Sequence, residues 1–476
     1  MENELAAIIL AAGLGTRMRS GRAKVLHEIG GAPMLARVIR AVAALDPAAL
    51  AVVIGHQADE VAAAARRASP DIAISFCLQS TQRGTGDAAR FGLEALGTPP
   101  ESADILIING DMPRMRAKTL AAFHEAHRRA CADVSIVSVE LEQPGAYGRV
   151  VRDAAGAVRA IVEARDANSD QLAIREINAG AYIVRAPILR EALAMLRADN
   201  AQGEYYLTDI VAIAHSKGRV VQAWRAAAAA EFAGINSREE LAEMETEMRR
   251  TTNQRLMASG VTLVDPATAY VAEEAEIGPD TIIGPNVQIV GRCRIGTGVR
   301  IEGTAYLRDV EIGDRSFLKI GVRAEECHIG PECEVGPFAN LRTGTWLEGH
   351  NRIGNFVETK KARIGSGTKA SHLSYLGDAT IGSDTNIGCG VITVNYDGYD
   401  KHHTEIGSRC MVGCDTQLVA PVKVGDDVYV ASGTTILREV ADGALAMSHH
   451  PQRQKPGWTA EWHRRHAGTK RGSHQD

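Results

Sequence analysis

The chain has 476 residues, more than one hydrophobic core usually serves, so its length predicts two or three domains. Its 53 basic and 58 acidic residues give a formal net charge of −5, which excludes a nucleic-acid coat and gives no reason to expect an anionic membrane as partner. The apolar run over residues 5–14 is too short for a membrane span and lacks the flanks of a secretory signal. We therefore expect a cytoplasmic protein that acts on small molecules.

Eight cysteines are scattered along the chain without a Cys-x-x-Cys pair. Neither the spacing of a zinc site nor that of a disulfide framework is present. We expect all eight to be reduced thiols.

Residues 1–236 alternate aliphatic runs with alanine-rich stretches of helical pattern. This alternation is typical of βα units around a mainly parallel, buried sheet. It predicts an α/β domain of Rossmann-like architecture. We expect its strands at residues 7–10, 51–54, 72–76, 105–108 and 134–139.

The first of these strands leads into a glycine-rich turn with basic residues, Leu10-Ala-Ala-Gly13-Leu-Gly-Thr-Arg17, and Lys24 follows. Glycines after a strand let backbone N–H groups surround phosphate, and Arg17 and Lys24 add positive charge suited to a triphosphate. The spacing is neither that of the Walker loop nor that of the dinucleotide fingerprint. By itself the turn is weak evidence for a nucleotide site.

Two later turns fit the same picture. Gln79 and Gly84-Thr85 form a small-residue turn that a base or ribose could approach, although it could equally be an ordinary turn. Asn109-Gly110-Asp111 follows a strand, and the carboxyl ends of strands are where α/β proteins bind ligands. The Asp111 carboxylate is suited to Mg²⁺, but the residues alone leave a helix cap equally open.

Residues 237–260 read as a linker helix. Ser237 and Glu240 form a capping box, and Leu241, Met244 and Met248 share one face. Gly260 is suited to end the helix.

From residue 261 to about 450 the period changes to six. A strict period of six cannot be helical, and it predicts a parallel β-solenoid in which three hexapeptides make one coil. We expect a basic, partly disordered tail over 451–476. The inward-facing positions are predicted to be Ile277, Ile283, Ile289, Ile295, Ile301, Leu307, Ile329, Val335, Leu341, Leu347, Ile353, Ile406, Val412, Leu418, Val424, Val430 and Ile436.

The six-residue step breaks at 319–328, 361–376 and 391–405. Breaks in a solenoid are usually loops that carry function or contacts, so we expect loops there. His372 falls in the second break, where an imidazole could act as a general base, although a histidine taken alone is more often structural. Glu358 is the candidate to orient it. The repeat alone leaves open whether the solenoid is an acyltransferase or a passive trimer-forming tail.

At Leu10–Met18 and Lys24 the chain resembles the sugar-1-phosphate nucleotidyltransferases. The segments 354–362, 370–378, 386–390 and 395–398 extend the resemblance, over residues 5 to about 457, to the family of bifunctional bacterial N-acetylglucosamine-1-phosphate uridylyltransferases and glucosamine-1-phosphate acetyltransferases. The resemblance implies a left-handed β-helix, a homotrimer with acetyl sites between subunits, and no nucleic-acid or membrane partner. It also implies acetyl transfer from acetyl-CoA to glucosamine-1-phosphate, then uridylyl transfer from UTP with Mg²⁺, giving the cell-envelope precursor UDP-N-acetylglucosamine and pyrophosphate.

The resemblance assigns roles to residues of both halves. In the first half Arg17 and Lys24 act in uridylyl transfer, Asp111 and Asn236 hold Mg²⁺, and His372 is the acetyltransferase base of the second half. The nucleotide-sugar contacts it implies are Leu10, Ala11, Ala12, Gly13, Lys24, Gln79, Gly84, Thr85, Asn109, Gly110, Asp111, Gly148, Glu163, Asn178 and Asn236. In the solenoid it implies Arg342, Lys360, Tyr375, Asn386 and Lys401 for the sugar phosphate, and Cys389, Asn395, Tyr396, Cys414, Ser432 and His449 for acetyl-CoA.

Four positions depart from the family pattern. Ala23 stands where proline usually precedes the lysine, which predicts a looser loop. Cys414 replaces a serine, Ser432 an alanine and His449 an arginine, so the departures other than Ala23 all fall on the acetyl-CoA side. His449 carries a less constant charge than arginine, which predicts weaker binding of the CoA phosphates at higher pH.

Two other functions remain open at this point. One is a pyrophosphorylase of single activity whose solenoid only oligomerises or regulates, and the Glu358, His372 and Asn395 segments disfavour it. The other is a non-enzymatic trimeric scaffold that binds a nucleotide sugar, which the presence of Arg17, Lys24 and Asp111 disfavours.

Overall fold

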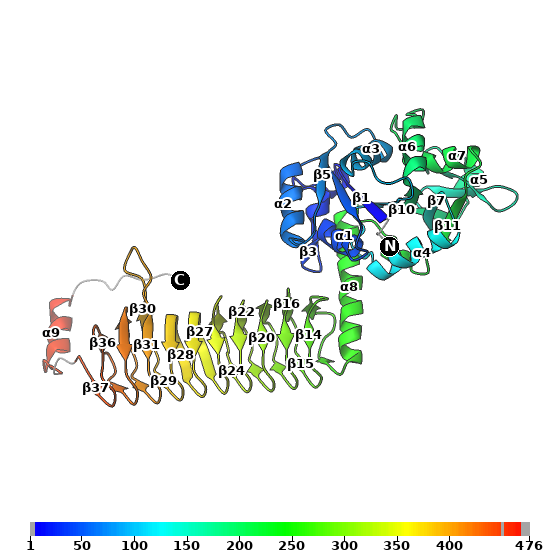
Figure 1. Ribbon diagram of the computed structural model, residues 1–476. Helices are drawn as coiled ribbons and strands as arrows, with labels where there is room; N and C mark the ends of the chain where they lie inside the picture. Colours follow the sequence, from blue (N-terminus) through cyan, green and yellow to red (C-terminus); the bar gives the residue numbers. More distant parts are fainter. Residues whose placement is uncertain (1–4, 449–451, 468–476) are drawn as a thin grey trace. The chain divides into compact units, whose positions relative to one another are not determined.

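The computed structural model describes residues 5–448 and 452–467 and divides the chain into two compact units, residues 1–250 and 251–476. Helix α8 (Arg238–Ala258) begins in the first unit and ends in the second. A short helix, α9 (Trp458–Arg465), lies in the tail (Figure 1). Among the helices of the described residues, none has the length and apolar character needed to cross a membrane.

The first unit is built on a nine-stranded sheet, in which seven strands follow the order β11-β7-β10-β6-β1-β4-β5 and β8 and β9 lie off this path. Along this order neighbouring strands run parallel, except that β10 is antiparallel to both β6 and β7, and β8 is antiparallel to β10 and β9. The predicted Rossmann-like α/β fold is confirmed. The strands are β1 (Leu5–Ala11), β4 (Ala49–Ile54), β5 (Ser75–Leu78), β6 (Asp104–Asn109), β7 (Val134–Glu140), β8 (Arg149–Arg152), β9 (Val158–Val162), β10 (Glu176–Arg185) and β11 (Val221–Arg225), with a small separate pair β2 (Glu28–Ile29) and β3 (Ala32–Pro33).

Each face of this sheet carries its own hydrophobic core. Along β1, Ala7 and Ile9 pack into one core and Ala6 and Ile8 into the other, which is the alternation of a strand buried on both faces. Helices α1 (Met34–Ala43), α2 (Ala58–Ala68) and α4 (Ala117–Arg129) contribute to the first core. Helices α3 (Thr85–Ala95), α6 (Ala186–Met195) and α7 (Asp209–Ser216) contribute to the second.

One strand prediction was misplaced. The strand expected at 72–76 is β5, which begins only at Ser75. The backbone N–H of Ile72 donates to the Ser69 carbonyl (3.3 Å), so Ile72 lies in a turn even though its side chain packs on the core. The apolar side chain of Ile72 therefore made the sequence pattern include a turn residue in the strand.

A buried polar network lies at the start of β6. The Asp104 carboxylate contacts Nε2 of His124 (2.9 Å) and Nε2 of His127 (3.3 Å), and His127 Nδ1 bonds to Ser135 Oγ (2.7 Å). Burial alone would raise the pKa of Asp104, but the hydrogen bonds from His124 and His127 outweigh it and hold that pKa well below its usual range. The carboxylate thus stabilises the fold in its ionised form.

We expect Asp104→Asn to lower the free energy of unfolding of the first unit by about 1–3 kcal/mol at pH 7, because the buried imidazoles lose a charged partner. For a unit of this size, each kcal/mol corresponds to roughly 2–4 °C in melting temperature. Since the folded-state pKa is depressed, the contribution is complete above the unfolded pKa of about 3.9 and disappears as the pH falls further. Calorimetry at pH 7 and pH 3 checks this, with the exposed Asp71→Asn as control; an equal loss at both pH values would contradict it.

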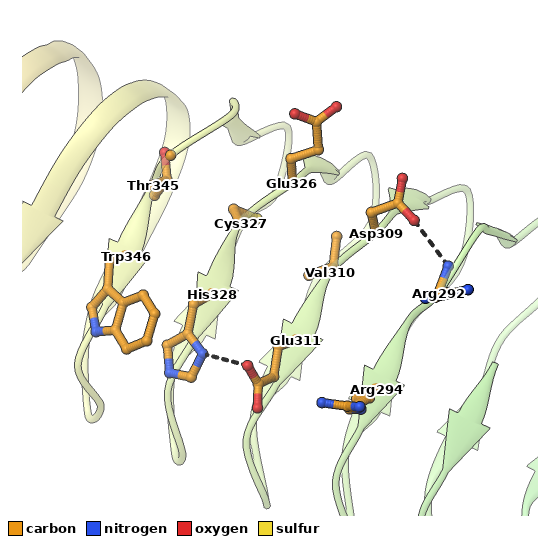
Figure 2. Close-up of a pocket in the computed structure, with 11 residues that line it drawn as sticks. Arg292, Arg294, Asp309, Val310, Glu311, Glu326, Cys327, His328, Thr345 and Trp346 are labelled. Carbon is orange, nitrogen blue, oxygen red and sulfur yellow. Dashed lines mark hydrogen bonds and ion pairs between the residues drawn. The ribbon is translucent and has the colours of Figure 1, made fainter. Parts of the chain in front are cut away.

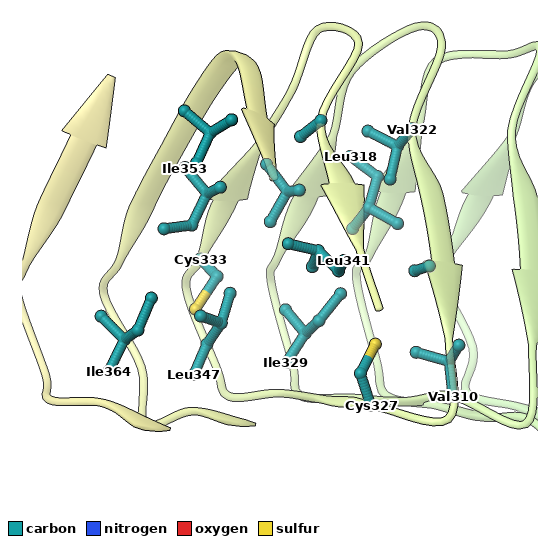
Figure 3. Close-up of a cluster of buried hydrophobic side chains, with 14 of the residues drawn as sticks. Val310, Leu318, Val322, Cys327, Ile329, Cys333, Leu341, Leu347, Ile353 and Ile364 are labelled. Carbon is teal, nitrogen blue, oxygen red and sulfur yellow. The ribbon is translucent and has the colours of Figure 1, made fainter. Parts of the chain in front are cut away.

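The second unit is a parallel β-helix. Its 26 strands, from β12 (Thr262–Leu263) to β37 (Leu445–Ala446), are mostly two or three residues long, and strands pair with the third strand along the chain. Three strands therefore make one coil. The aliphatic residues of the six-residue period point inward and are at most 5 % exposed, apart from a partly buried Ile277, as predicted. Figure 3 shows one file of this core, in which Ile329, Leu347 and Ile364 stack on successive coils.

Only one of the three register breaks contains a loop that projects from the solenoid. At 319–328 the coils pair residues 17 apart, such as Glu311 with His328, where the first coils pair residues 18 apart, so the break removes one corner residue. Most of 361–376 lies in two long strands, β27 (Arg352–Ile364) and β28 (Lys369–Ile381), and the loop predicted there was wrong. The third break carries a true loop, residues 395–403, between β30 (Ile392–Val394) and β31 (Thr404–Ile406) (Figure 1).

Candidate functional site

A cavity of about 440 Å³ lies in the first unit where β1 and β6 end. The glycine-rich turn after β1 and the turn before α3 both line it, together with Lys24 and Asp111. Most of the nucleotide contacts predicted for this half therefore share one cavity. The predicted residues that line it are Leu10, Ala11, Ala12, Gly13, Lys24, Gln79, Gly84, Thr85, Asn109 and Asp111.

The glycine-rich turn packs directly on Lys24. Gly15 has a left-handed backbone (φ 61°), and a Cβ there would lie 2.6 Å from Lys24 Cβ, so a side chain would push the two apart. Ala23, which stands where the family usually has proline, has a tertiary hydrogen bond. Its backbone N–H donates to Gln57 Oε1 (2.5 Å), a hydrogen bond that proline could not make.

Lys24 lies between the two predicted metal ligands. Its ammonium pairs with the Asp111 carboxylate and donates to Asn236 Oδ1 (3.1 Å). Both side chains of the Lys24–Asp111 pair are largely buried, at 14 % and 16 % exposed. The oxygen atoms of Asp111 and Asn236 thus converge on one cation.

The start of α8 fixes Asn236 in this position. Glu240 N–H donates to Ser237 Oγ (3.1 Å), as the predicted capping box requires. The Glu240 carboxylate, however, accepts from the backbone N–H of Asn236 (2.6 Å), not from Ser237. The backbone N–H of Ile235 in turn donates to the Asp111 carbonyl (3.1 Å). These hydrogen bonds therefore hold Asn236 close to Asp111, the other predicted metal ligand.

The three residues predicted to surround the sugar form a second group. Asn178 N–H donates to the Gly148 carbonyl (2.9 Å), and a Cβ on Gly148 would lie 3.4 Å from Glu163 Oε1. Burial raises the pKa of Glu163 above its ordinary value, and only a hydrogen bond from Thr208 opposes this. Gly180 lies against both Asn178 and Asn109, which joins this group to the nucleotide cavity.

Arg17 does not line the first cavity. It lines a second cavity of about 540 Å³ together with Asn236, Tyr147 and Glu240. The sequence also missed several residues of the first cavity, among them the polar Gln82 and Glu204. Glu204 comes from the segment between α6 and α7, which carries no motif, and Asn200 holds it there by two hydrogen bonds (2.6 and 3.1 Å).

In the solenoid, the three predicted phosphate ligands Arg342, Lys360 and Lys401 come together. The Lys401 ammonium lies against that of Lys360 and lowers the pKa of Lys360, to which Arg342 adds. Glu358 was expected to pair with His372. Its carboxylate instead accepts a hydrogen bond from Arg342 Nη1 (2.7 Å). The register explains this, because Glu358 lies beside Tyr375 and His372 lies beside Asn355. The cluster is a positive site at the base of the loop 395–403.

Tyr375 and Asn395 lie next to these cations. Asn395 Nδ2 donates to Asp378 Oδ2 (2.5 Å) and reaches the Tyr375 hydroxyl (3.5 Å). Tyr396 follows in the loop and is 57 % exposed. A group with both polar and aromatic surface thus adjoins the three positive charges.

His372 is the first member of a file, meaning a row of residues at equivalent positions on successive coils, and the other members are predicted acetyl-CoA residues. Its side chain is exposed, and within the described residues it has no hydrogen bond or ion pair. Asn386 lies on a different face from Tyr375, beside Lys369, and contacts Met411 Sδ (3.2 Å), so one chain does not bring these two predicted sugar contacts together. His449 lies outside the described residues. The file comprises His372, Cys389, Cys414 and Ser432, each two residues after a stacked position, Ala370, Ile387, Val412 and Val430.

A third cavity, of about 460 Å³, lies on the solenoid and is lined by none of the predicted residues (Figure 2). His328 stacks on Trp346 (ring centroids 3.8 Å apart) and contacts Glu311 (3.2 Å). Arginines and carboxylates line it together, so it has no excess of positive charge for a phosphate.

Models of known protein families match parts of both units. Residues 7–179 match the model of the MobA-like NTP transferase domain, 266–338 that of the GMPPB C-terminal domain, and 403–438 that of the bacterial transferase hexapeptide. A solved structure of UDP-glucose pyrophosphorylase complexed with UDP-glucose aligns at a TM-score of 0.42 and 15 % identity, over 52 % of this chain and 98 % of that one.

The fold and these matches define a nucleotidyltransferase joined to a left-handed β-helix of the hexapeptide acyltransferases. Bifunctional protein GlmU of Pelobacter propionicus is 47 % identical over 96 % of this chain and 98 % of its own, and that of Trichlorobacter lovleyi is 44 % identical over 95 % and 97 %. The chain belongs to the GlmU family. It is a bifunctional enzyme that acetylates glucosamine-1-phosphate and transfers a uridylyl group to the product, giving UDP-N-acetylglucosamine.

Proposed function

We propose that the cavity after β1 and β6 is the uridylyl-transfer site and that Asp111 and Asn236 hold Mg²⁺ there. The supporting observation is that their oxygen atoms already converge on a cation, the Lys24 ammonium. One carboxylate and one amide oxygen suit Mg²⁺, which takes its remaining ligands from water and phosphate. Among the described residues no group of three or more His, Cys, Asp or Glu side chains could hold a metal, so the proposal rests on Asp111 and Asn236 alone.

The reaction is in-line attack of a sugar phosphate on the α-phosphorus of UTP. Mg²⁺, when bound, supplies charge neutralisation on the phosphate oxygens. Lys24 then turns from Asp111 to the phosphates and, with Arg17, stabilises the leaving pyrophosphate. The buried group Gly148, Glu163 and Asn178 orients the sugar. No general base is required, because the attacking phosphate is already ionised.

In the solenoid, Arg342, Lys360 and Lys401 bind the phosphate of glucosamine-1-phosphate. Their mutual repulsion, visible in the lowered pKa of Lys360, is relieved when an anion binds. His372 removes the proton from the sugar amine so that the amine can attack the thioester. Tyr375 and Asn386 hold the sugar, and Cys389, Asn395, Tyr396, Cys414, Ser432 and His449 contact acetyl-CoA.

The separation of Asn386 from Tyr375 supports a homotrimer. If chains pack side by side, the Asn386 face of one chain can meet the Tyr375 face of another and complete the sugar site. We further propose a cytoplasmic protein with small-molecule substrates and no nucleic-acid or membrane partner. The proposed division is a nucleotidyltransferase domain over 1–236, a linker helix over 237–260, an acetyltransferase β-helix over 261–450 and a basic, partly disordered tail over 451–476.

Omission of single substrates tests these assignments. With glucosamine-1-phosphate, UTP and Mg²⁺, we expect pyrophosphate release only when acetyl-CoA is also present, while N-acetylglucosamine-1-phosphate should release it without acetyl-CoA. Chelation of Mg²⁺ should stop pyrophosphate release and leave CoA release unchanged. Continued release of pyrophosphate in the chelator would contradict the metal assignment.

A further inference from the structure

Two cysteines are neighbours on adjacent coils of the solenoid. Ile387 pairs with Val412, and the Asp415 N–H donates to the Cys389 carbonyl (2.7 Å), so Cys389 and Cys414 stand opposite each other in the register. Neighbouring strands are about 4.8 Å apart, and disulfides join residues whose Cα atoms are about 4.4–6.8 Å apart. Both thiols are free, Cys414 exposed and Cys389 half-buried.

The other solenoid cysteines differ. Cys293, Cys327, Cys333 and Cys410 are buried, and burial raises the pKa of each thiol, to about 12 for Cys327 and about 11 for Cys333. Such thiols stay protonated and react slowly. The accessible thiols of this unit are therefore concentrated in one pair, in the same file as His372.

We propose that Cys389 and Cys414 form a reversible disulfide that switches off acetyl transfer. The thiolate of the exposed Cys414 attacks a small-molecule disulfide and releases one of its halves as a thiol; the thiolate of Cys389 then attacks Cys414 Sγ and releases the other half. One sulfur–sulfur bond breaks and one forms, two small thiols are produced, and each cysteine gives up one proton. This inference rests on the proposed acetyl-CoA role of both residues.

The disulfide would change the surface that contacts the thioester of acetyl-CoA. Joining the two sulfurs removes both S–H donors from the file and ties two coils together beside His372. Acetyl-CoA would then meet a changed surface, while the uridylyl site lies in the other unit and its cavity is lined by no cysteine. Oxidation should therefore separate the two activities of one protein.

The test treats the full-length protein with oxidised glutathione, then maps disulfides by peptide mass spectrometry and measures N-acetylglucosamine-1-phosphate formation and pyrophosphate release. We expect a Cys389–Cys414 peptide, acetyl transfer lowered at least about tenfold and restored by dithiothreitol, and unchanged pyrophosphate release from N-acetylglucosamine-1-phosphate. In Cys414→Ser, the ratio of oxidised to reduced acetyl transfer should be near one, whereas Cys389→Ala should stop at a glutathione adduct on Cys414 and form no internal bond. Cys131→Ser, which removes an exposed thiol of the first unit, should behave as the parent protein.

Three results would overturn the inference: a glutathione adduct on Cys414 without the internal bond, an internal bond that leaves acetyl transfer unchanged, or equal sensitivity of the Cys414→Ser protein. Failure of the proposed acetyl site gives a different result. In that case the reduced protein would bind no acetyl-CoA at this file, and Cys389→Ala and Cys414→Ser would leave the KM for acetyl-CoA unchanged.

Discussion

Asp111→Asn is expected to lower uridylyl transfer by about 10²–10³-fold, the usual cost of removing one electrostatic contributor to a transition state. The substitution keeps the shape of the side chain but removes the charge that faces the Lys24 ammonium and that we propose for Mg²⁺. Pyrophosphate release from N-acetylglucosamine-1-phosphate and UTP measures the effect. Raising the Mg²⁺ concentration should recover part of the activity, because the loss is partly one of metal affinity.

Acetyl transfer by the same variant is the internal control, since it depends on the other unit and should keep its parent rate. Asp71→Asn, an exposed aspartate of the first unit, is the matched control and should change neither activity. An Asp111→Asn protein with parent-like pyrophosphate release and Mg²⁺ dependence would remove Asp111 from the metal site.

His372→Ala is expected to lower acetyl transfer by about 10²–10⁴-fold, the usual contribution of a general base. The side chain is exposed, so its removal leaves the solenoid core unchanged. The loss should lessen as the pH rises, because a larger fraction of the sugar amine is then unprotonated without help. Initial rates of N-acetylglucosamine-1-phosphate formation across pH 6–9 check both points.

The matched control is His350→Ala, which removes another exposed histidine of the solenoid, one that pairs with Glu332 (3.1 Å). It should keep the parent rate and pH profile. A His372→Ala protein with the parent pH profile, whatever its rate, would show that His372 does not act as the base.

The sequence predicted the solenoid well because each coil contacts only its neighbours. A residue such as Leu347 is buried by Ile329 and Ile364, which occupy equivalent positions one coil away. The period of six therefore predicts directly which residues form the core. The cation cluster of Arg342, Lys360 and Lys401 depends instead on a loop that doubles back, and its members were assigned through family resemblance. Glu358 was paired wrongly because the parallel pairing of β27 with β28 sets Glu358 beside Tyr375 and His372 beside Asn355, and Glu358 instead accepts from Arg342.

In the first unit, the phosphate turn was predicted from residues close together in sequence. Asp111 and Asn236 converge from segments that are far apart in the chain. From the residues alone, Asp111 could equally have been a helix cap instead of a metal ligand. Glu204 was missed because its position depends on Asn200 and on contact with Gly84, which are tertiary effects without a sequence motif. The cap formed by Glu240 was recognised, but its bond to Asn236 depends on the path of the chain before α8.

The central claim is that one chain carries two independent sites that act in sequence. Mixing Asp111→Asn and His372→Ala proteins tests it most directly, with glucosamine-1-phosphate, acetyl-CoA, UTP and Mg²⁺ supplied together. Each variant alone should form little UDP-N-acetylglucosamine, and the mixture should form it at a rate approaching that of the parent protein, because the acetylated intermediate passes from one protein to the other. A mixture no more active than its components would contradict the account.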